Sequence, residues 1–171
     1  KPANEPVKEY RPGSPERIAL EAELKKQSNE VIEIPIIIGG KEIRTGNMGD
    51  VVMPTDHKHL LARYHKVGEK EVQMAIDAAM AAHKEWAETP WIDRASVMMK
   101  IAALLAGKYR YDMNAATMLG QGKTTMQAEI DSACEAIDFF KFNVHYASQI
   151  YADQPISDSG TLYRLEYRPL E

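Results

Sequence analysis

The stretch GQGKTTMQAEIDSACEAIDFFKFNVHYASQIY, from Gly120 to Tyr151, contains the best-defined element of the chain. Charged side chains, Lys141 among them, cover much of one side of it. On the other side, apolar residues recur at the three- and four-residue spacing of a helical face: Met126, Ile130, Ala133, Cys134, Ile137, Phe140, Val144 and Ala147. The pattern predicts one long amphipathic helix from about Thr124 to Tyr151, with Cys134 as a buried core residue.

Three shorter helices are expected before this one. The first follows Gly68, stops before Pro90 and shows an apolar face made by Val72, Ala75, Ile76, Ala79, Ala82, His83 and Trp86. The second starts at the signal Thr89-Pro90, can end at Gly107 and buries Val97, Met98, Ile101, Ala102 and Leu105. The third runs from about Tyr109 to Leu119 and ends at Gly120.

The region before these helices predicts an arm, a helix and short strands. Prolines in residues 1–13 favour an extended arm, and Ser14-Pro15-Glu16 is a helix start, so a helix should run to about Ser28. Alternating isoleucines at 34, 36 and 38, the turn Gly39-Gly40 and the return 42–44 predict a hairpin. Two more strands, at 50–53 and 61–67, have no assigned pairing.

The last predicted element is a strand from Thr161 to Arg168, which alternates between two faces and stops at Pro169. A strand near the end of the chain has no following partner in the same chain. We therefore expect it to continue into a longer parent protein or to pair with another chain.

Composition limits the classes of partner. A net charge of -4 and a pI near 5.8 give no electrostatic reason to expect nucleic acid as a partner. The longest apolar run, Val97 to Ala106, is interrupted by Lys100 and is too short to cross a bilayer, so no membrane partner is expected. Cys134 is the only cysteine, so no internal disulfide can form. The chain opens at Lys1 without a signal region, which suggests a removed targeting segment or a cut chain.

Several stretches resemble nucleotide-binding, metal-binding or catalytic motifs but lack residues that these motifs require. The segment Gly120–Thr124 is not a P-loop, because Thr117 stands where a glycine is needed, and it is not a dinucleotide fingerprint, because Thr125 replaces the third glycine. We interpret it as a helix C-cap followed by a new helix start. A metal site at His57, His59 and His65 lacks a defined third ligand, and Cys134 has nothing nearby to hold a thiolate. Three carboxylates of the long helix have the spacing of a solvated face: Glu129, Asp131 and Glu135.

The motif GQGKT at 120–124, followed by QAEID at 127–131, IDFFKFN at 137–143 and YA at 146–147, resembles the aldehyde dehydrogenase superfamily. Shorter stretches agree in the same order: ANEPV at 3–7, GSPER at 13–17, AAHKEW at 81–86, DRA at 93–95 and QPIS at 154–157. The Phe-rich helix and the Asn-Glu-Pro arm are similar to the branch of the superfamily that acts on pyrroline-5-carboxylate. The resemblance covers nearly the whole chain.

This resemblance implies the N-terminal part of an α/β, aldehyde dehydrogenase-like fold, helix-dominated with short strands and a C-terminal oligomerisation strand. It implies an extended arm at 1–13, a helical and hairpin part of the cofactor-domain region at 14–150, and the start of the oligomerisation strands at 151–171. A homodimer and a location in the mitochondrial matrix are also implied.

The implied activity is oxidation of glutamate γ-semialdehyde, in equilibrium with pyrroline-5-carboxylate, to glutamate with NAD, in proline breakdown. The family's nucleophilic cysteine, general base and NAD-binding glycine turn lie beyond the position of Glu171. We therefore expect no catalytic, cofactor-binding or metal-binding residue here, and no activity from this chain alone. The one implied site residue is Glu129, which would pair with the ammonium group of the aldehyde substrate. The alternatives are an exposed helix carboxylate at Glu129 and a non-enzymatic scaffold module that retains half of the fold.

Overall fold

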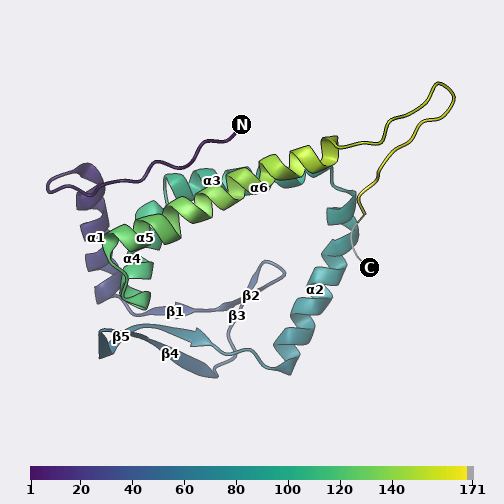
Figure 1. The fold of residues 1–171 in the computed structure, drawn as a ribbon. Coiled ribbons are helices and arrows are strands. Elements are labelled where there is room, and N and C mark those ends of the chain that lie inside the picture. Colours follow the sequence, from purple (N-terminus) through teal and green to yellow (C-terminus); the bar gives the residue numbers. More distant parts are fainter. Residues whose placement is uncertain (169–171) are drawn as a thin grey trace.

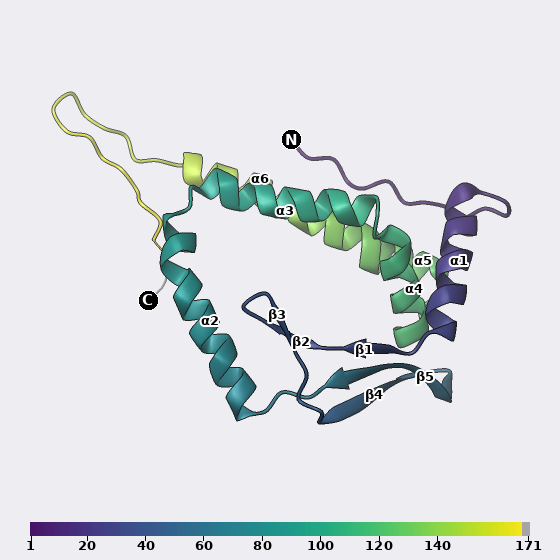
Figure 2. The same cartoon turned by 180° about the vertical axis from the view of Figure 1, so that it is seen from behind.

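The computed structural model describes residues 1–168, which form a helical layer and a strand layer on either side of an opening (Figure 1). The helical layer contains α1 (Pro15–Asn29), α3 (Trp91–Ala106), α4 (Arg110–Gln121) and a long helical segment that begins at Thr125. Helix α2 (Glu69–Glu88) runs along one side and connects the two layers, as the view from behind also shows (Figure 2). This mixed, helix-rich architecture confirms the expected fold class.

The strand layer consists of a three-stranded sheet and a separate hairpin. In the sheet, β5 (Asp56–His65) lies between β1 (Ile32–Ile34), to which it is parallel, and β4 (Met48–Met53), to which it is antiparallel. The hairpin pairs β2 (Ile36–Ile38) with β3 (Lys41–Ile43) in antiparallel register. The predicted hairpin is thus confirmed, and the sheet supplies the pairing that the pattern left open.

Two residues, a proline and a glycine, explain where elements end. Pro35 separates β1 from β2, so the isoleucine run expected as one strand divides between two sheets, because proline has no N–H to donate to a ladder. The predicted end of α4 at Gly120 was two residues too early: the helix continues to Gln121, and Gly122 is the cap, with a φ of 68°. Only a residue without a Cβ adopts this left-handed conformation at low cost.

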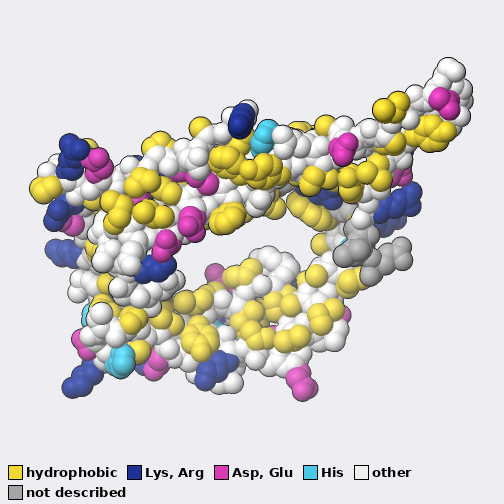
Figure 3. Space-filling model, viewed as in Figure 1, with side chains coloured by type: hydrophobic (Ala, Val, Ile, Leu, Met, Phe, Trp, Pro, Cys, Tyr) yellow, Lys and Arg dark blue, Asp and Glu magenta, His cyan; other side chains and the backbone are white. Residues whose placement is uncertain are grey.

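The core is small and lies within the helical layer. One cluster joins Tyr10, Leu20 and Ala115, and the other joins Ala102, Ala133 and Ile137 where α3 packs on the long helix. Helix α2 has no buried residue, and its predicted apolar face is exposed to solvent, with Val72 and Ile76 each half exposed. Hydrophobic side chains gather around the opening (Figure 3). None of the helices within residues 1–168 is long and apolar enough to span a membrane.

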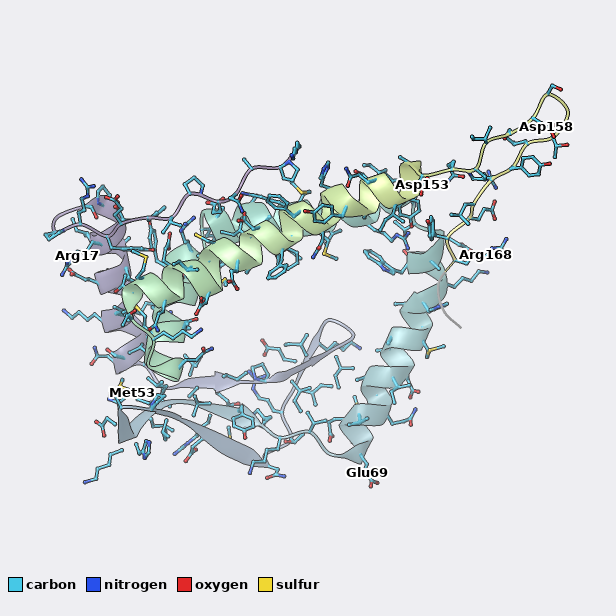
Figure 4. The ribbon with its side chains drawn as sticks, in the orientation of Figure 1. Arg17, Met53, Glu69, Asp153, Asp158 and Arg168 are labelled. Atoms are coloured by element: carbon cyan, nitrogen blue, oxygen red, sulfur yellow. The ribbon has the colours of Figure 1, made fainter. Side chains whose placement is uncertain are left out.

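Residues 153–168 leave the end of the long helix, reach the tip near Asp158 and return to Arg168 (Figure 4). The expected strand at 161–168 is not formed in the described chain. Side chains take the place of a backbone ladder: the Gln154 amide bonds to both backbone groups of Leu165, at 2.9 and 3.3 Å, and Ser157 Oγ bonds to both groups of Tyr163. Within the described chain, the outgoing residues 153–158 and the returning residues 161–168 form no backbone ladder with one another, and a strand needs such a ladder. The predicted stop at Pro169 lies outside the described residues.

Candidate functional site

The connection from α4 to the long helix, at Gly120–Thr124, joins one helix cap to another. After Gly122, the Oγ1 of Thr124 accepts a hydrogen bond from the Gln127 amide, and the Gln127 side chain accepts one from the Thr124 amide at 2.9 Å. The Lys123 ammonium group is 2.6 Å from Asp131. The segment follows a helix and its side chains are occupied locally. This confirms the interpretation as a C-cap followed by a new helix start.

The long helical segment contains one widened turn. Helix α5 (Thr125–Ala128) passes into the π-helix η1 (Glu129–Cys134) and then into α6 (Glu135–Ala152). The prediction of one regular α-helix was therefore wrong at this turn, because six residues adopt the wider i→i+5 geometry. Such turns are rare and frequent at functional sites. Here the turn begins at Glu129 and buries it together with Ala133 and Cys134.

Glu129 is completely buried, and both oxygens of its carboxylate accept several hydrogen bonds. Its Oε1 accepts from the Lys8 amide at 2.8 Å and from Arg110 Nη2 at 2.5 Å. Its Oε2 accepts from the Tyr10 hydroxyl at 2.7 Å, the Asn114 amide at 2.8 Å and Arg110 Nε at 3.3 Å. The alternative of an exposed helix carboxylate is therefore wrong for Glu129. Its contact with a substrate stays a prediction.

Arg110 joins the N-terminal arm to the widened turn. Its guanidinium, 1% exposed, donates to Glu129, to Glu5 Oε1 at 2.7 Å and to the Pro6 carbonyl at 2.9 Å. The second oxygen of Glu5 is 2.6 Å from Lys141 Nζ. Lys141, Glu5, Arg110 and Glu129 thus form one network of alternating charges, so the buried charges compensate one another.

The pKa values in this network follow from the pairing. Burial alone would raise the pKa of Glu129, but hydrogen bonds from Arg110, Tyr10 and the Lys8 amide outweigh it and hold the pKa below its ordinary value. Burial and the neighbouring Glu129 carboxylate raise the pKa of the Tyr10 hydroxyl. Burial would lower the pKa of Arg110, whereas its bonds to Glu129 and Glu5 raise it. The site therefore holds an ionised carboxylate, an ionised guanidinium and a neutral phenol.

Two further irregularities lie at the same place. Tyr10 has a φ of 52°, the only positive value among the described non-glycine residues. The Asn114 Oδ1 atom is buried and has no hydrogen-bond partner within the described chain, while the amide nitrogen of the same side chain donates to Tyr10 and Glu129. Backbone strain and unsatisfied polar atoms concentrate at functional sites in proteins. Together with the widened turn, they mark this network as the candidate site.

Among the other residues considered from sequence, Cys134 borders the network, because Arg110 Nη2 lies 3.6 Å from its Sγ. Cys134 is 6% exposed, which confirms its prediction as a buried core residue, and burial together with Glu129 raises the pKa of its thiol. His65 is buried and its Nε2 lies 3.0 Å from Glu33, whereas His59 contacts the Ser28 carbonyl. His57 and the other two histidines do not converge on a shared ligand position in the described chain.

Sequence reasoning missed Arg110, Tyr10, Asn114 and Glu5 as site residues. Tyr10 and Glu129 are 119 positions apart, so no local spacing connects them. One signal was available: Glu129 has the helical spacing of its apolar neighbours Met126 and Ala133, and a carboxylate on a buried face requires a partner.

Comparison with known proteins identifies the class of protein. Residues 43–170 match the family model described as Aldehyde dehydrogenase family, so the chain belongs to the aldehyde dehydrogenase family. This confirms the resemblance seen in the sequence.

Particular relatives narrow the class. The chain is 49% identical over 170 residues to delta-1-pyrroline-5-carboxylate dehydrogenase, mitochondrial, of Emericella nidulans, covering 98% of this chain and 30% of that protein. It is 46% identical to the probable delta-1-pyrroline-5-carboxylate dehydrogenase of Schizosaccharomyces pombe, covering 98% of this chain and 31% of that protein.

A solved structure agrees with these relatives. The crystal structure of the delta-pyrroline-5-carboxylate dehydrogenase from Mycobacterium tuberculosis matches with a TM-score of 0.96 at 46% identity, covering 99% of this chain and 32% of that one. The chain thus spans about a third of the length of the proteins it matches.

Proposed function

We propose that this chain is the N-terminal part of an NAD-dependent dehydrogenase that oxidises glutamate γ-semialdehyde, in equilibrium with pyrroline-5-carboxylate, to glutamate in proline catabolism. The observation that carries the proposal is the high identity to named pyrroline-5-carboxylate dehydrogenases over nearly the whole chain. A fold match with a TM-score of 0.96 supports it. A substrate that is an amino acid also suits a segment with a buried, ionised carboxylate.

The described residues do not fit NAD. The Mycobacterium tuberculosis relative has been solved with NAD bound, so NAD is the cofactor we propose for the whole protein. In this chain, however, the glycine-containing turn at 120–124 follows a helix, and Thr124 and Lys123 are bonded to Gln127 and Asp131. The Lys123 ammonium group and the Thr124 amide are therefore engaged within the chain and are not free for a pyrophosphate. NAD would be held by the part of the relatives that this chain does not span.

The test compares this chain with the longer gene product. Incubation of the longer product with glutamate γ-semialdehyde and NAD should produce NADH, and the 171-residue chain alone should not. Failure of the longer product to reduce NAD with this aldehyde would remove the proposal. NADH formation by the 171-residue chain would instead show that catalytic residues exist here.

We propose that Glu129 contacts the ammonium group of the aldehyde substrate in the whole protein. Its lowered pKa supports this role, because the carboxylate is ionised at neutral pH. Its contacts within this chain are all internal, so a ligand has to replace some of the present donors. Glu129→Gln in the longer protein should raise KM more than it lowers kcat. An unchanged KM would contradict the contact.

The competing proposal is a non-enzymatic module that retains this part of the fold. The exposed apolar face of α2 favours an interaction role, since Val72, Ile76 and Met80 are each at least half exposed. A longer gene product with a catalytic half would exclude this alternative, whereas a natural protein with a native mass near 19.2 kDa would support it.

Assembly and location are proposed on similar grounds. Several relatives are named mitochondrial, among them the human and Emericella nidulans proteins, and we propose the mitochondrial matrix for this one. We also propose a homodimer, for which the projecting segment 153–168 supplies backbone that belongs to no ladder in the described chain. Cell fractionation with protease protection tests the location. A cytosolic distribution of the longer protein would contradict it.

A further inference from the structure

Residues 1–10, called the strap below, lie across the helical layer and cover the buried ion pair. In Figure 1 the strap runs from the N-terminus beside α6 toward the start of α1. Tyr10 is its only buried residue, whereas Val7 is half exposed. Burial of apolar surface therefore holds the strap at one position only, at its Tyr10 end.

Polar contacts make the remaining attachments of the strap. The Asn4 side chain and the Glu5 amide both donate to Asp138, at 2.8 and 2.7 Å. Glu5 is held between Arg110 and Lys141. The Lys8 amide and the Tyr10 hydroxyl donate to Glu129. Most of these bonds involve a charged group that water solvates well when the strap is absent.

The attached strap carries three local costs. The left-handed backbone of Tyr10 is strained, since a side chain with a Cβ disfavours a φ of 52°. The Asn114 Oδ1 atom is buried without a donor. Glu129 and Arg110 are removed from water almost completely. Release relaxes the Tyr10 backbone and removes the strap contacts that cover Glu129 and Arg110, so water reaches these two charges.

We propose that the strap is a releasable latch over the Glu129–Arg110 pair, which detaches while the helical layer stays folded. The helical layer does not depend on the strap for its main packing, because α3 packs on α6 through Ala102, Ala133 and Ile137. Helix α1 packs on α4 with Leu20 against Ala115, and Tyr10 of the strap joins this cluster, so release removes one side chain from it and leaves the contact between the two helices. Release exposes an ionised carboxylate at the widened turn, which is otherwise closed to any ligand.

The link between the latch and substrate binding rests on the proposed function, whereas the latch itself does not. If Glu129 contacts the substrate, the Lys8 amide and the Tyr10 hydroxyl are the two donors that release removes. Arg110 and Asn114 belong to α4 and stay beside Glu129. A measurement of strap opening in the 171-residue chain needs no enzyme activity, so failure of the latch and failure of the proposed function are distinguishable.

Amide hydrogen exchange followed by NMR on the 171-residue chain tests the latch. The Lys8 amide, which donates to buried Glu129, should exchange faster than the amides in the middle of α4 and α6. Glu5→Gln removes the charge held by Arg110 and Lys141 and should raise Lys8 exchange by at least about tenfold, with α6 unchanged. Glu9→Gln is the control, because Glu9 is exposed and forms its ion pair with exposed Arg11.

The result that overturns the latch is a Lys8 amide that exchanges at the same rate as the α4 and α6 amides in the unmodified chain. The strap would then open only when the whole chain unfolds. Equal effects of Glu5→Gln and Glu9→Gln on Lys8 exchange would also overturn it. The comparison within the unmodified chain decides the question even if Glu5→Gln fails to fold.

Discussion

Replacement of Arg110 by methionine is expected to be strongly destabilising. The guanidinium is 1% exposed and forms hydrogen bonds with Glu5, Pro6 and Glu129. Methionine fills much of the same volume but donates nothing. Glu129 then remains buried as a carboxylate whose main counter-charge is gone, while the Tyr10, Asn114 and Lys8 donors stay in place.

The magnitude follows from the geometry of the pair. Removal of one partner from a buried ion pair costs about 3–5 kcal/mol, because the other charge is left without compensation. With a urea dependence of about 2 kcal/mol/M for a chain of this size, the unfolding midpoint should fall by about 1.5–2.5 M. The double variant Arg110→Met with Glu129→Leu should recover much of this loss, because both buried charges are then removed.

Urea unfolding followed by far-UV circular dichroism measures both variants. The matched control is Arg17→Met, since Arg17 forms an ion pair of 2.7 Å with Glu21 on an exposed helix surface, where side-chain exposures are 45% and 59%. This control should change stability by less than about 0.5 kcal/mol. If Arg110→Met costs no more than Arg17→Met, the network is not an energetic centre and the reasoning fails.

Three other predictions concern the acid response, one glycine and the projecting segment. The pKa values of Glu5 and Glu129 both lie below their ordinary value of 4.5, so their stabilising contribution is present above that pH and is lost as the pH falls below it. The urea midpoint of the double variant Glu5→Gln, Glu129→Gln should therefore fall less steeply with decreasing pH in this window. An equal pH dependence of the two midpoints would contradict the role of these carboxylates. Gly122→Ala should cost about 1–2 kcal/mol of stability because of the φ of 68°, and not through a clash, since the nearest atoms to an added Cβ are an ordinary 3.9 Å away. Gly120→Ala lies inside α4 with open space beside it and should stabilise the chain by about 1 kcal/mol. Thermal unfolding midpoints that shift in the same direction for both variants would refute this difference. Leu165→Pro removes the N–H that donates to Gln154. It should lower the oligomeric mass of the longer protein in analytical ultracentrifugation without loss of helix. An unchanged mass would contradict the proposed role of this segment in assembly.

Local chemistry explains why the elements themselves were predictable. The Ser14-Pro15 start of α1, the Gly39-Gly40 turn and the Thr124 capping box all depend on residues within a few positions of one another. Two of the departures from the predicted elements are also local in origin but weaker in signal. Pro35 divides an isoleucine run, and Gly120 lies inside a helix whose cap is Gly122.

The sequence by itself determined most of the helices and strands, the family resemblance and the core position of Cys134, because periodicity and capping act between near neighbours. Only the tertiary structure decided what surrounds Glu129, since Glu5 and Tyr10 reach the site from the far end of the chain. Helical spacing alone was consistent with Glu129 on either a solvent-exposed or a buried face of the helix. Whether Glu129 can be buried depends on the network around Arg110, which lies within 3 Å of Glu5 although the two residues are more than 100 positions apart. Three-dimensional packing alone determines that distance.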